Sequence, residues 1–500
     1  MKIKFYLFFS FILFGFFIFA QEKSNDTLLI PKYSGTTIRE FWKEMDDIFN
    51  DPNFDNANWG VVIQSLETGE YFYRRNENKL FIPASDLKLF TTSAALILLG
   101  PEYCFSTNIF MNGTMDGSVL DGDLIVRGRG DPTISGRFYN DDKYKVFKDW
   151  ADSLSKIGID EITGNIIGDD NRFDNLGLGK GWAWDDESYW FSAPSGAISF
   201  NDNVVDIVVK VNKKKNLPII ITDPSTKYIV FINNVAVVPN DSITAVDVYR
   251  QRGTNIVNVF GTIRKQDSVK TYVTVNNPTQ YSMVVLKSVL QNKDLKIDGF
   301  PMDIDDISRI PPDKNLNRLF MYYSPPLKEI IKVINKNSEN FYSEQLLKTI
   351  GLEMEGFGTA ENGIKAEDNV FRDMGILPEG MIIVDGSGLS RLNLVTPHQI
   401  VTLLSYMYKS KYFIPFFNSL PIAGVDGTIG KRMKKTKAEN NLRAKTGTHI
   451  GVSSISGYVF TLDDEPIAFS IIANNYNVPV KIAENIEDLV CLRLANFKRK

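Results

Sequence analysis

Pro83-Ala84-Ser85-Asp86-Leu87-Lys88 stands at the start of an expected helix and carries a serine and a lysine three positions apart. Residues with this spacing lie on one face of a helix, so the Ser85 hydroxyl and the Lys88 amine are neighbours there. A lysine can activate a serine as a base when a dry site and a second cation lower its pKa. The N-terminal end of a helix also offers N–H groups to a developing oxyanion. Ser-x-x-Lys alone recurs by chance, and a solvated helix start is then the alternative interpretation.

Two further motifs follow in the chain and give the first one its weight. Ser338-Glu339-Asn340 opens a helical segment and supplies a hydroxyl and a carboxamide. Lys445-Thr446-Gly447-Thr448 precedes an apolar run that begins at Ile450, which is typical of an edge strand whose glycine admits a substrate backbone. Ser-x-x-Lys, Ser-x-Asn and Lys-Thr-Gly in this order resemble the signature of penicillin-binding proteins and serine β-lactamases.

The spacing of the motifs selects within that superfamily. The separation of Ser85 from Ser338 is far longer than in a compact β-lactamase. It resembles that of the low-molecular-mass D-alanyl-D-alanine carboxypeptidases of the peptidase S13 type, which carry two extra domains there. The resemblance spans roughly Trp59 to Ala473, and Asp86 stands where Asn or Thr is more usual. Further similar stretches are residues 122–132, 182–186, 385–391 and 423–428.

The resemblance implies a role for each motif residue. Ser85 would attack the carbonyl of a terminal D-Ala-D-Ala bond with Lys88 as base, Ser338 would relay a proton to the leaving amine, and Lys445 would supply positive charge. The substrate would be held by Asn340, Thr446, Gly447 and Thr448, and the N–H groups of Ser85 and Thr448 would bind the oxyanion. The partners implied are peptidoglycan stem peptides ending in D-Ala-D-Ala, with β-lactams as inhibitors. No metal or organic cofactor is implied.

The periodicity predicts an α/β (α+β) fold with a large β-rich insertion. A helix is expected over residues 37–49, a hairpin over 59–73 and a buried helix over 87–98. Short β-branched runs then extend to about residue 312, after which a helical pattern (327–350), an antiparallel pair (454–462 and 467–473) and a last helix from about residue 480 follow. This order of elements predicts one α/β domain, made of residues 21–103 plus 313–500, that residues 104–312 interrupt. The resemblance implies that this domain has the penicillin-binding, β-lactamase-like fold, an antiparallel sheet flanked by helices, and that the insertion forms two subdomains.

The N-terminus predicts export. Lys2 and Lys4 precede an uncharged run from Phe5 to Ala20, which is typical of a signal peptide over residues 1–20. An uncleaved anchor is the alternative, although the run is shorter than the roughly 20 residues that cross a bilayer. The mature protein is expected in the periplasm, outside the cytoplasm, with at most peripheral association with membrane or wall.

Composition excludes several other classes. A net charge of −4 and a pI near 5.6 give no basic excess for a nucleic acid. The two histidines, His398 and His449, form no H-E-x-x-H zinc pair, and no G-x-S-x-G elbow accompanies them for a serine triad. Cys104 and Cys491 lie near opposite ends of the chain, and free buried thiols are expected, although the sequence leaves their pairing open.

Two functional alternatives remain open at this stage. One is a serine esterase or β-lactamase that uses the same apparatus, and the other is a non-catalytic peptidoglycan-binding protein. The balance of carboxypeptidase and endopeptidase action is also undecided. The aromatic residues between Trp182 and Phe191 are expected to pack the insertion against the catalytic domain, with a wall for glycan or stem peptide as the alternative. Asp385-Gly386-Ser387-Gly388 is expected to be a structural turn near the site.

Overall fold

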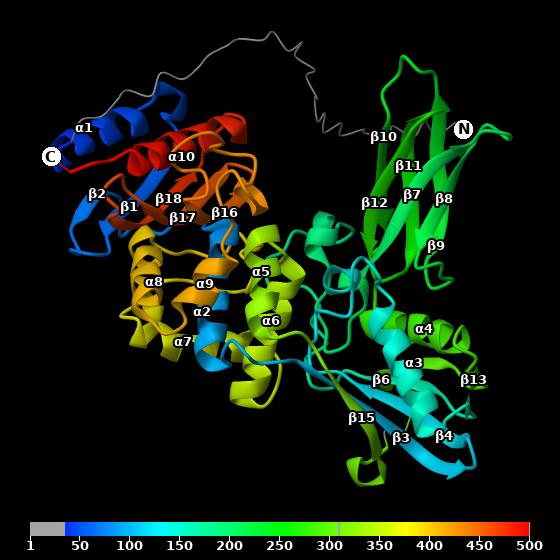
Figure 1. Ribbon diagram of the computed structural model, residues 1–500. Coiled ribbons are helices and arrows are strands. Elements are labelled where there is room, and N and C mark those ends of the chain that lie inside the picture. Colours follow the sequence, from blue (N-terminus) through cyan, green and yellow to red (C-terminus); the bar gives the residue numbers. More distant parts are fainter. Residues whose placement is uncertain (1–35, 309–310, 500) are drawn as a thin grey trace, which may run out of the picture.

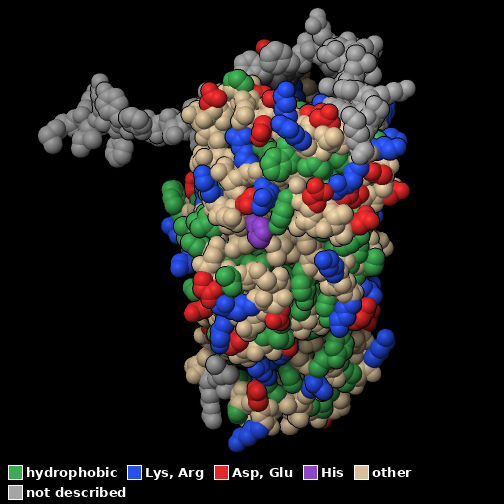
Figure 2. Space-filling model, turned by 90° about the vertical axis from the view of Figure 1, so that its left-hand side faces the viewer, with side chains coloured by type: hydrophobic (Ala, Val, Ile, Leu, Met, Phe, Trp, Pro, Cys, Tyr) green, Lys and Arg blue, Asp and Glu red, His purple; other side chains and the backbone are tan. Residues whose placement is uncertain are grey.

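The computed structural model describes residues 36–308 and 311–499. Figure 1 shows an α/β part on one side and a β-rich part on the other. The expected signal peptide lies outside the described residues. Within the described part, no helix combines the length and the apolar character needed to cross a bilayer. Acidic and basic side chains lie interspersed over the face shown in Figure 2, in agreement with the near-balanced charge.

A five-stranded antiparallel sheet forms the centre of the α/β part. Two of its inner strands, β17 and β18, are buried along almost their whole length because helices cover both faces of the sheet. β16, which carries the Lys-Thr-Gly motif, lies at one edge, as the sequence predicts. In spatial order the strands are β16 (Arg443–His449), β17 (Val452–Phe460), β18 (Pro466–Asn474), β1 (Asn58–Ser65) and β2 (Tyr71–Arg75).

Two helices from opposite ends of the chain cover one face of this sheet, α1 (Ile38–Phe49) and α10 (Val480–Ala495). Thr37 begins α1 with a capping box to Glu40, which satisfies free N–H groups of the first turn. Phe41, Met45 and Phe49 place their side chains in the core shared with the sheet. The helix and hairpin expected before the first motif are therefore confirmed.

The other face carries α2 (Lys88–Leu98), which is buried at nearly every position, as expected. The helical pattern expected over 327–350 forms two helices, because Ser338 has left-handed backbone (φ 60°) and separates them. Their apolar side chains pack with α2 in one core. The helices of this layer are α5 (Leu327–Asn337), α6 (Asn340–Glu355), α7 (Ala360–Asp373), α8 (Pro397–Lys409) and α9 (Phe413–Ser419).

The chain leaves the α/β part after α2 and builds three sheets in the inserted segment. A seven-stranded sheet carries two helices, and two three-stranded sheets stand beyond it (Figure 1). The seven-stranded sheet holds β3 (Ser106–Asp116), β4 (Val119–Arg127), β5 (Glu161–Ile162), β6 (Ile166–Asp169), β13 (Lys296–Ile297), β14 (Pro301–Asp303) and β15 (Asn317–Tyr323), with helices α3 (Lys145–Ile157) and α4 (Pro278–Gln291). The others hold β7 (Val204–Asn212), β8 (Leu217–Asp223) and β12 (Ser268–Thr274), and β9 (Val230–Val238), β10 (Ala245–Arg250) and β11 (Ile256–Arg264).

β15 lies past the end expected for the insertion. Its residues follow position 312, but the strand pairs with β3 and completes the edge of the inserted sheet. Its hydrogen bonds therefore place it with the insertion. Cys104 and Cys491 are both free; Cys491 is buried, as expected, whereas Cys104 is partly exposed.

Candidate active site

The nucleophile candidate Ser85 sits in a tight 3-10 turn, Ala84–Leu87, that leads directly into α2. The residue before it, Ala84, has left-handed backbone with φ 48°. For a residue with a Cβ this conformation costs roughly 1–2 kcal/mol, so surrounding contacts must hold it. One of them is Gly388, where an added Cβ would come within 1.9 Å of the Ala84 carbonyl oxygen. The turn thereby leaves the Ser85 side chain half-buried at the end of a buried helix.

Lys88 is fully buried and has three hydrogen-bond acceptors. Its Nζ donates to Ser85 Oγ (3.0 Å), to Asn340 Oδ1 (2.7 Å) and to the Ser387 carbonyl (2.6 Å). All three acceptors are neutral. Burial, and then the positive charge of Lys445, lower the Lys88 pKa well below its usual value. The Lys88 amine is therefore suited to take a proton from Ser85.

Lys445 and Ser338 form the second pair of the site. Lys445 Nζ donates to Ser338 Oγ (2.9 Å) and to the Thr446 carbonyl (2.6 Å). Burial lowers the Lys445 pKa to about 8, against the opposing field of Asp86. The two polar residues of the Ser-x-Asn motif thus contact different lysines: Ser338 binds Lys445, and Asn340 binds Lys88. Asn340 Nδ2 carries two hydrogens and donates one of them to the Phe191 carbonyl (2.8 Å).

The Lys-Thr-Gly strand lies directly against the nucleophile turn. A Cβ at Gly447 would come within 2.5 Å of the Pro83 carbonyl oxygen and 2.8 Å of the Ser85 nitrogen. Glycine at this position is therefore needed for the approach of the chain's own backbone, before any substrate enters. Thr446 Oγ1 donates to Thr428 Oγ1 (2.6 Å), and Thr448 is exposed at the strand edge.

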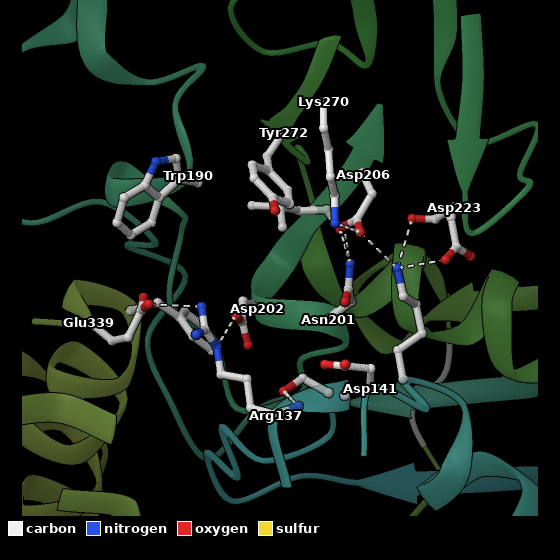
Figure 3. A pocket seen from close by; sticks show the side chains of 15 residues that line it. Arg137, Asp141, Trp190, Asn201, Asp202, Asp206, Asp223, Lys270, Tyr272 and Glu339 are labelled. Carbon is white, nitrogen blue, oxygen red and sulfur yellow. Dashed lines mark hydrogen bonds and ion pairs between the residues drawn. The ribbon is translucent and has the colours of Figure 1, made fainter. Parts of the chain in front are cut away.

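The insertion contacts the Ser-x-Asn motif through Glu339 (Figure 3). Arg137 donates from Nη2 to Glu339 Oε1 (2.8 Å) and from Nε to Asp202 Oδ2 (2.7 Å). Burial raises the Glu339 pKa to about 7, and Arg137 opposes that rise. These groups, with the half-exposed Trp190, line a cavity of about 590 Å³. No local sequence pattern predicts this contact, because Arg137 and Glu339 are far apart in the chain.

The Asp385–Gly388 loop is structural, as expected, and also reaches the base. Glu344 accepts hydrogen bonds from the Gly386 and Ser387 N–H groups (3.1 and 2.8 Å), and Trp182 Nε1 donates to Asp385 Oδ2 (3.0 Å). The loop therefore presents the Ser387 carbonyl to Lys88. Sequence reasoning missed this role, because a main-chain acceptor leaves no trace in residue type.

The histidines form hydrogen bonds away from the Ser85 hydroxyl. His398 Nε2 pairs with the Tyr71 hydroxyl (3.4 Å), and His449 Nε2 pairs with the Gly388 carbonyl (2.9 Å). Burial lowers the His449 pKa. Since Lys88 occupies the hydrogen-bonding position beside Ser85 Oγ, the geometry favours a serine–lysine apparatus over a histidine triad.

Comparison with known proteins agrees with this geometry. The sequence model of the D-Ala-D-Ala carboxypeptidase 3 (S13) family matches residues 41–496. The chain belongs to this family. This S13 protein is accordingly a serine-type D-alanyl-D-alanine carboxypeptidase.

The relatives of this S13 enzyme match along most of its length. A D-alanyl-D-alanine carboxypeptidase of Actinomadura sp. (strain R39) is 31% identical over 477 residues, covering 93% of this chain and 86% of that protein. One from Haemophilus influenzae is 27% identical over 430 residues, covering 85% and 86%. The crystal structure of penicillin binding protein 4 from Haemophilus influenzae, at 25% identity, matches with a TM-score of 0.79 over 91% of this chain and 99% of that one. The expected penicillin-binding, β-lactamase-like fold class is confirmed.

Proposed function

We propose that this S13 enzyme removes the terminal D-alanine from peptidoglycan stem peptides through an acyl-enzyme on Ser85. The 3.0 Å approach of buried Lys88 Nζ to Ser85 Oγ carries this proposal, because the Ser85 hydroxyl can donate its proton to the amine when Lys88 is neutral. Ser85 Oγ attacks the carbonyl carbon of the D-Ala-D-Ala bond while Lys88 takes the hydroxyl proton. The N–H groups of Ser85 and Thr448 bind the resulting oxyanion, and such a donor typically contributes about 3–4 kcal/mol.

The leaving group departs through the second pair. Lys445 holds the Ser338 hydroxyl, which passes its proton to the amine of the departing D-alanine as the C–N bond breaks and regains one from the Lys88 ammonium, so that the proton taken from Ser85 leaves with D-alanine. Lys445 also attracts the terminal carboxylate of the substrate. The free Nδ2 hydrogen of Asn340 and the edge of β16 at Thr446, Gly447 and Thr448 hold the peptide. Water then attacks the carbonyl carbon of the ester on Ser85. The bond to Ser85 Oγ breaks, the shortened peptide leaves with a free carboxyl group, and the Ser85 hydroxyl is restored.

We propose that β-lactams acylate Ser85 by the same route, because their strained amide places a carbonyl and a carboxylate as the D-Ala-D-Ala terminus does. The acyl-enzyme then persists. Rapid penicillin turnover would instead mark the β-lactamase alternative, and glycan binding without acylation would mark the binding-protein alternative.

The inserted segment is proposed to brace the site. Arg137 of the insertion holds Glu339 between Ser338 and Asn340, which supports this role. We propose that, among the described residues, the catalytic domain comprises residues 36–103 and 324–499 and that the segment between them is a two-part insertion; the pairing of β15 with β3 supports this boundary. Export to the periplasm remains a proposal that rests on residues 1–20.

The test is covalent labelling of the mature protein with a fluorescent penicillin, read by intact mass. Wild type should gain one adduct, and Ser85→Ala none. Ser93→Ala is the matched control, since the Ser93 hydroxyl lies on the same buried helix and donates to the Phe90 carbonyl. An adduct that survives in Ser85→Ala would refute the assignment. Release of D-alanine from a stem pentapeptide then separates hydrolysis of the natural bond from acylation alone.

A further inference from the structure

Asp86 is a buried carboxylate for which the reaction above has no use. It stands between Ser85 and Lys88 in the chain, and its side chain has no exposed surface. Ser456 Oγ donates to Asp86 Oδ2 (2.7 Å), whereas Oδ1 is buried without a hydrogen-bond partner. Burying a carboxylate is strongly unfavourable unless a positive charge compensates it. A positive charge near Asp86 would offset this cost.

The register of the sheet identifies that charge. Ser456 is the direct cross-strand partner of Lys445 in the antiparallel pair β16–β17. Side chains of directly opposed residues lie on the same face, with Cβ atoms about 4.5–5.5 Å apart. The carboxylate bound to Ser456 is therefore beside Lys445, whose own acceptors, Ser338 Oγ and the Thr446 carbonyl, are neutral. Asp86 and Lys445 form a buried charge pair that is not in direct contact.

We propose that Asp86 is a positioning residue that keeps Lys445 protonated, so that an ammonium beside Ser338 and a neutral amine on Lys88 coexist in one dry site. The inference rests on the proposed function, because it concerns the charge states that the reaction needs. It assigns a purpose to the acidic residue inside the Ser-x-x-Lys motif, a position where Asn or Thr is more usual.

The directions in which these buried groups shift one another's pKa values agree with this arrangement. Burial raises the pKa of Asp86, whereas Ser456 and Lys445 lower it; burial lowers the pKa of Lys445, whereas Asp86 raises it. The Lys445 charge in turn lowers the Lys88 pKa. Asp86 therefore acts on the base through Lys445.

Other charged groups face this pair and set the background. Asp385, Glu344 and Glu339 raise the Lys88 pKa, and Glu487 raises the Asp86 pKa. On β16 itself, Arg443 and His449 flank the motif. All of these stay unchanged when Asp86 alone is neutralised. Without the Asp86 charge, Lys445 should lose its proton at a lower pH.

The experiment is the pH dependence of the acylation rate in Asp86→Asn, with a fluorescent penicillin and the mature protein. Asn is close in size and can still accept from Ser456. The acid limb reports Lys88 and the alkaline limb reports Lys445. We expect the alkaline limb to move down by about one pH unit, whereas the acid limb stays in place because Lys445 is still protonated there, so that the bell narrows from its alkaline side.

Asp131→Asn is the matched control. Asp131 is also buried, accepts from Thr133 and has one oxygen without a partner, but it lies in the insertion. Its limbs should stay in place. Asp86→Thr, measured alongside, guards against a folding defect peculiar to one substitution. An alkaline limb that stays within about 0.2 pH unit of wild type in both Asp86 variants would overturn the inference, even if the rate falls uniformly. Wild type that is not acylated at any pH would overturn the proposed function instead.

Discussion

Gly447→Ala tests how closely the Lys-Thr-Gly strand and the nucleophile turn must approach. The new Cβ would lie 2.5 Å from the Pro83 carbonyl oxygen and 2.8 Å from the Ser85 nitrogen, against ordinary contacts of 3.4–4 Å. The strand and the turn must therefore separate by roughly 1 Å, and both contacts are main-chain atoms that no side-chain rotation can move. A displacement of that size costs about 100-fold in rate.

The same movement displaces the N–H groups of Ser85 and Thr448, which we propose as the oxyanion donors. Loss of one such donor costs about 100- to 1000-fold in kcat. We therefore expect the acylation rate of Gly447→Ala by a fluorescent penicillin to fall by about two to three orders of magnitude. The variant should still fold, because β16 is an edge strand. The assay is the second-order acylation rate, with thermal unfolding measured in parallel.

Gly196→Ala is the matched control. An added Cβ there meets only the Ile198 carbonyl oxygen, at 3.6 Å, so its acylation rate should equal that of wild type. Acylation of Gly447→Ala within threefold of the wild-type rate would refute the claim that this contact sets the oxyanion geometry.

Three further predictions follow from other contacts of the site. Gly388→Ala should unfold at a clearly lower temperature than Gly375→Ala, because both have left-handed backbone but only Gly388 lies against Ala84; equal melting temperatures would contradict this. Arg137→Ala should slow acylation about tenfold, because it releases Glu339. Arg252→Ala removes an exposed ion pair and should leave the acylation rate unchanged. Equal rates for the two variants in a stopped-flow assay would show that the ion pair of Arg137 with Glu339 does not support the site. The acylation rate should fall above about pH 8, because Lys445 loses its proton there. The fall should be smaller for a penicillin ester, which lacks the free carboxylate. The same alkaline limb for both compounds would show that Lys445 does not bind that carboxylate.

Much of the fold could be predicted from local patterns. The buried helix after Ser85 and the final antiparallel pair each follow from a periodicity within a few residues. Such patterns fail where the chain switches partners. The helical run from residue 327 is interrupted at Ser338, whose left-handed backbone ends α5 before α6 begins at Asn340. β15 joins β3 rather than the catalytic domain, and that choice depends on a strand distant in sequence.

The proposed reacting groups could be predicted without a structure, because Ser-x-x-Lys, Ser-x-Asn and Lys-Thr-Gly are short motifs in which residue type carries the chemistry. The contacts and fields that act on those groups could not. Lys88 is bound by the main-chain carbonyl of Ser387, Glu339 is held by Arg137 of the insertion, and Asp86 lies beside Lys445. The physical reason is that main-chain acceptors have no residue signature, and that the electrostatic fields of buried charges act through space between residues that only the fold brings together.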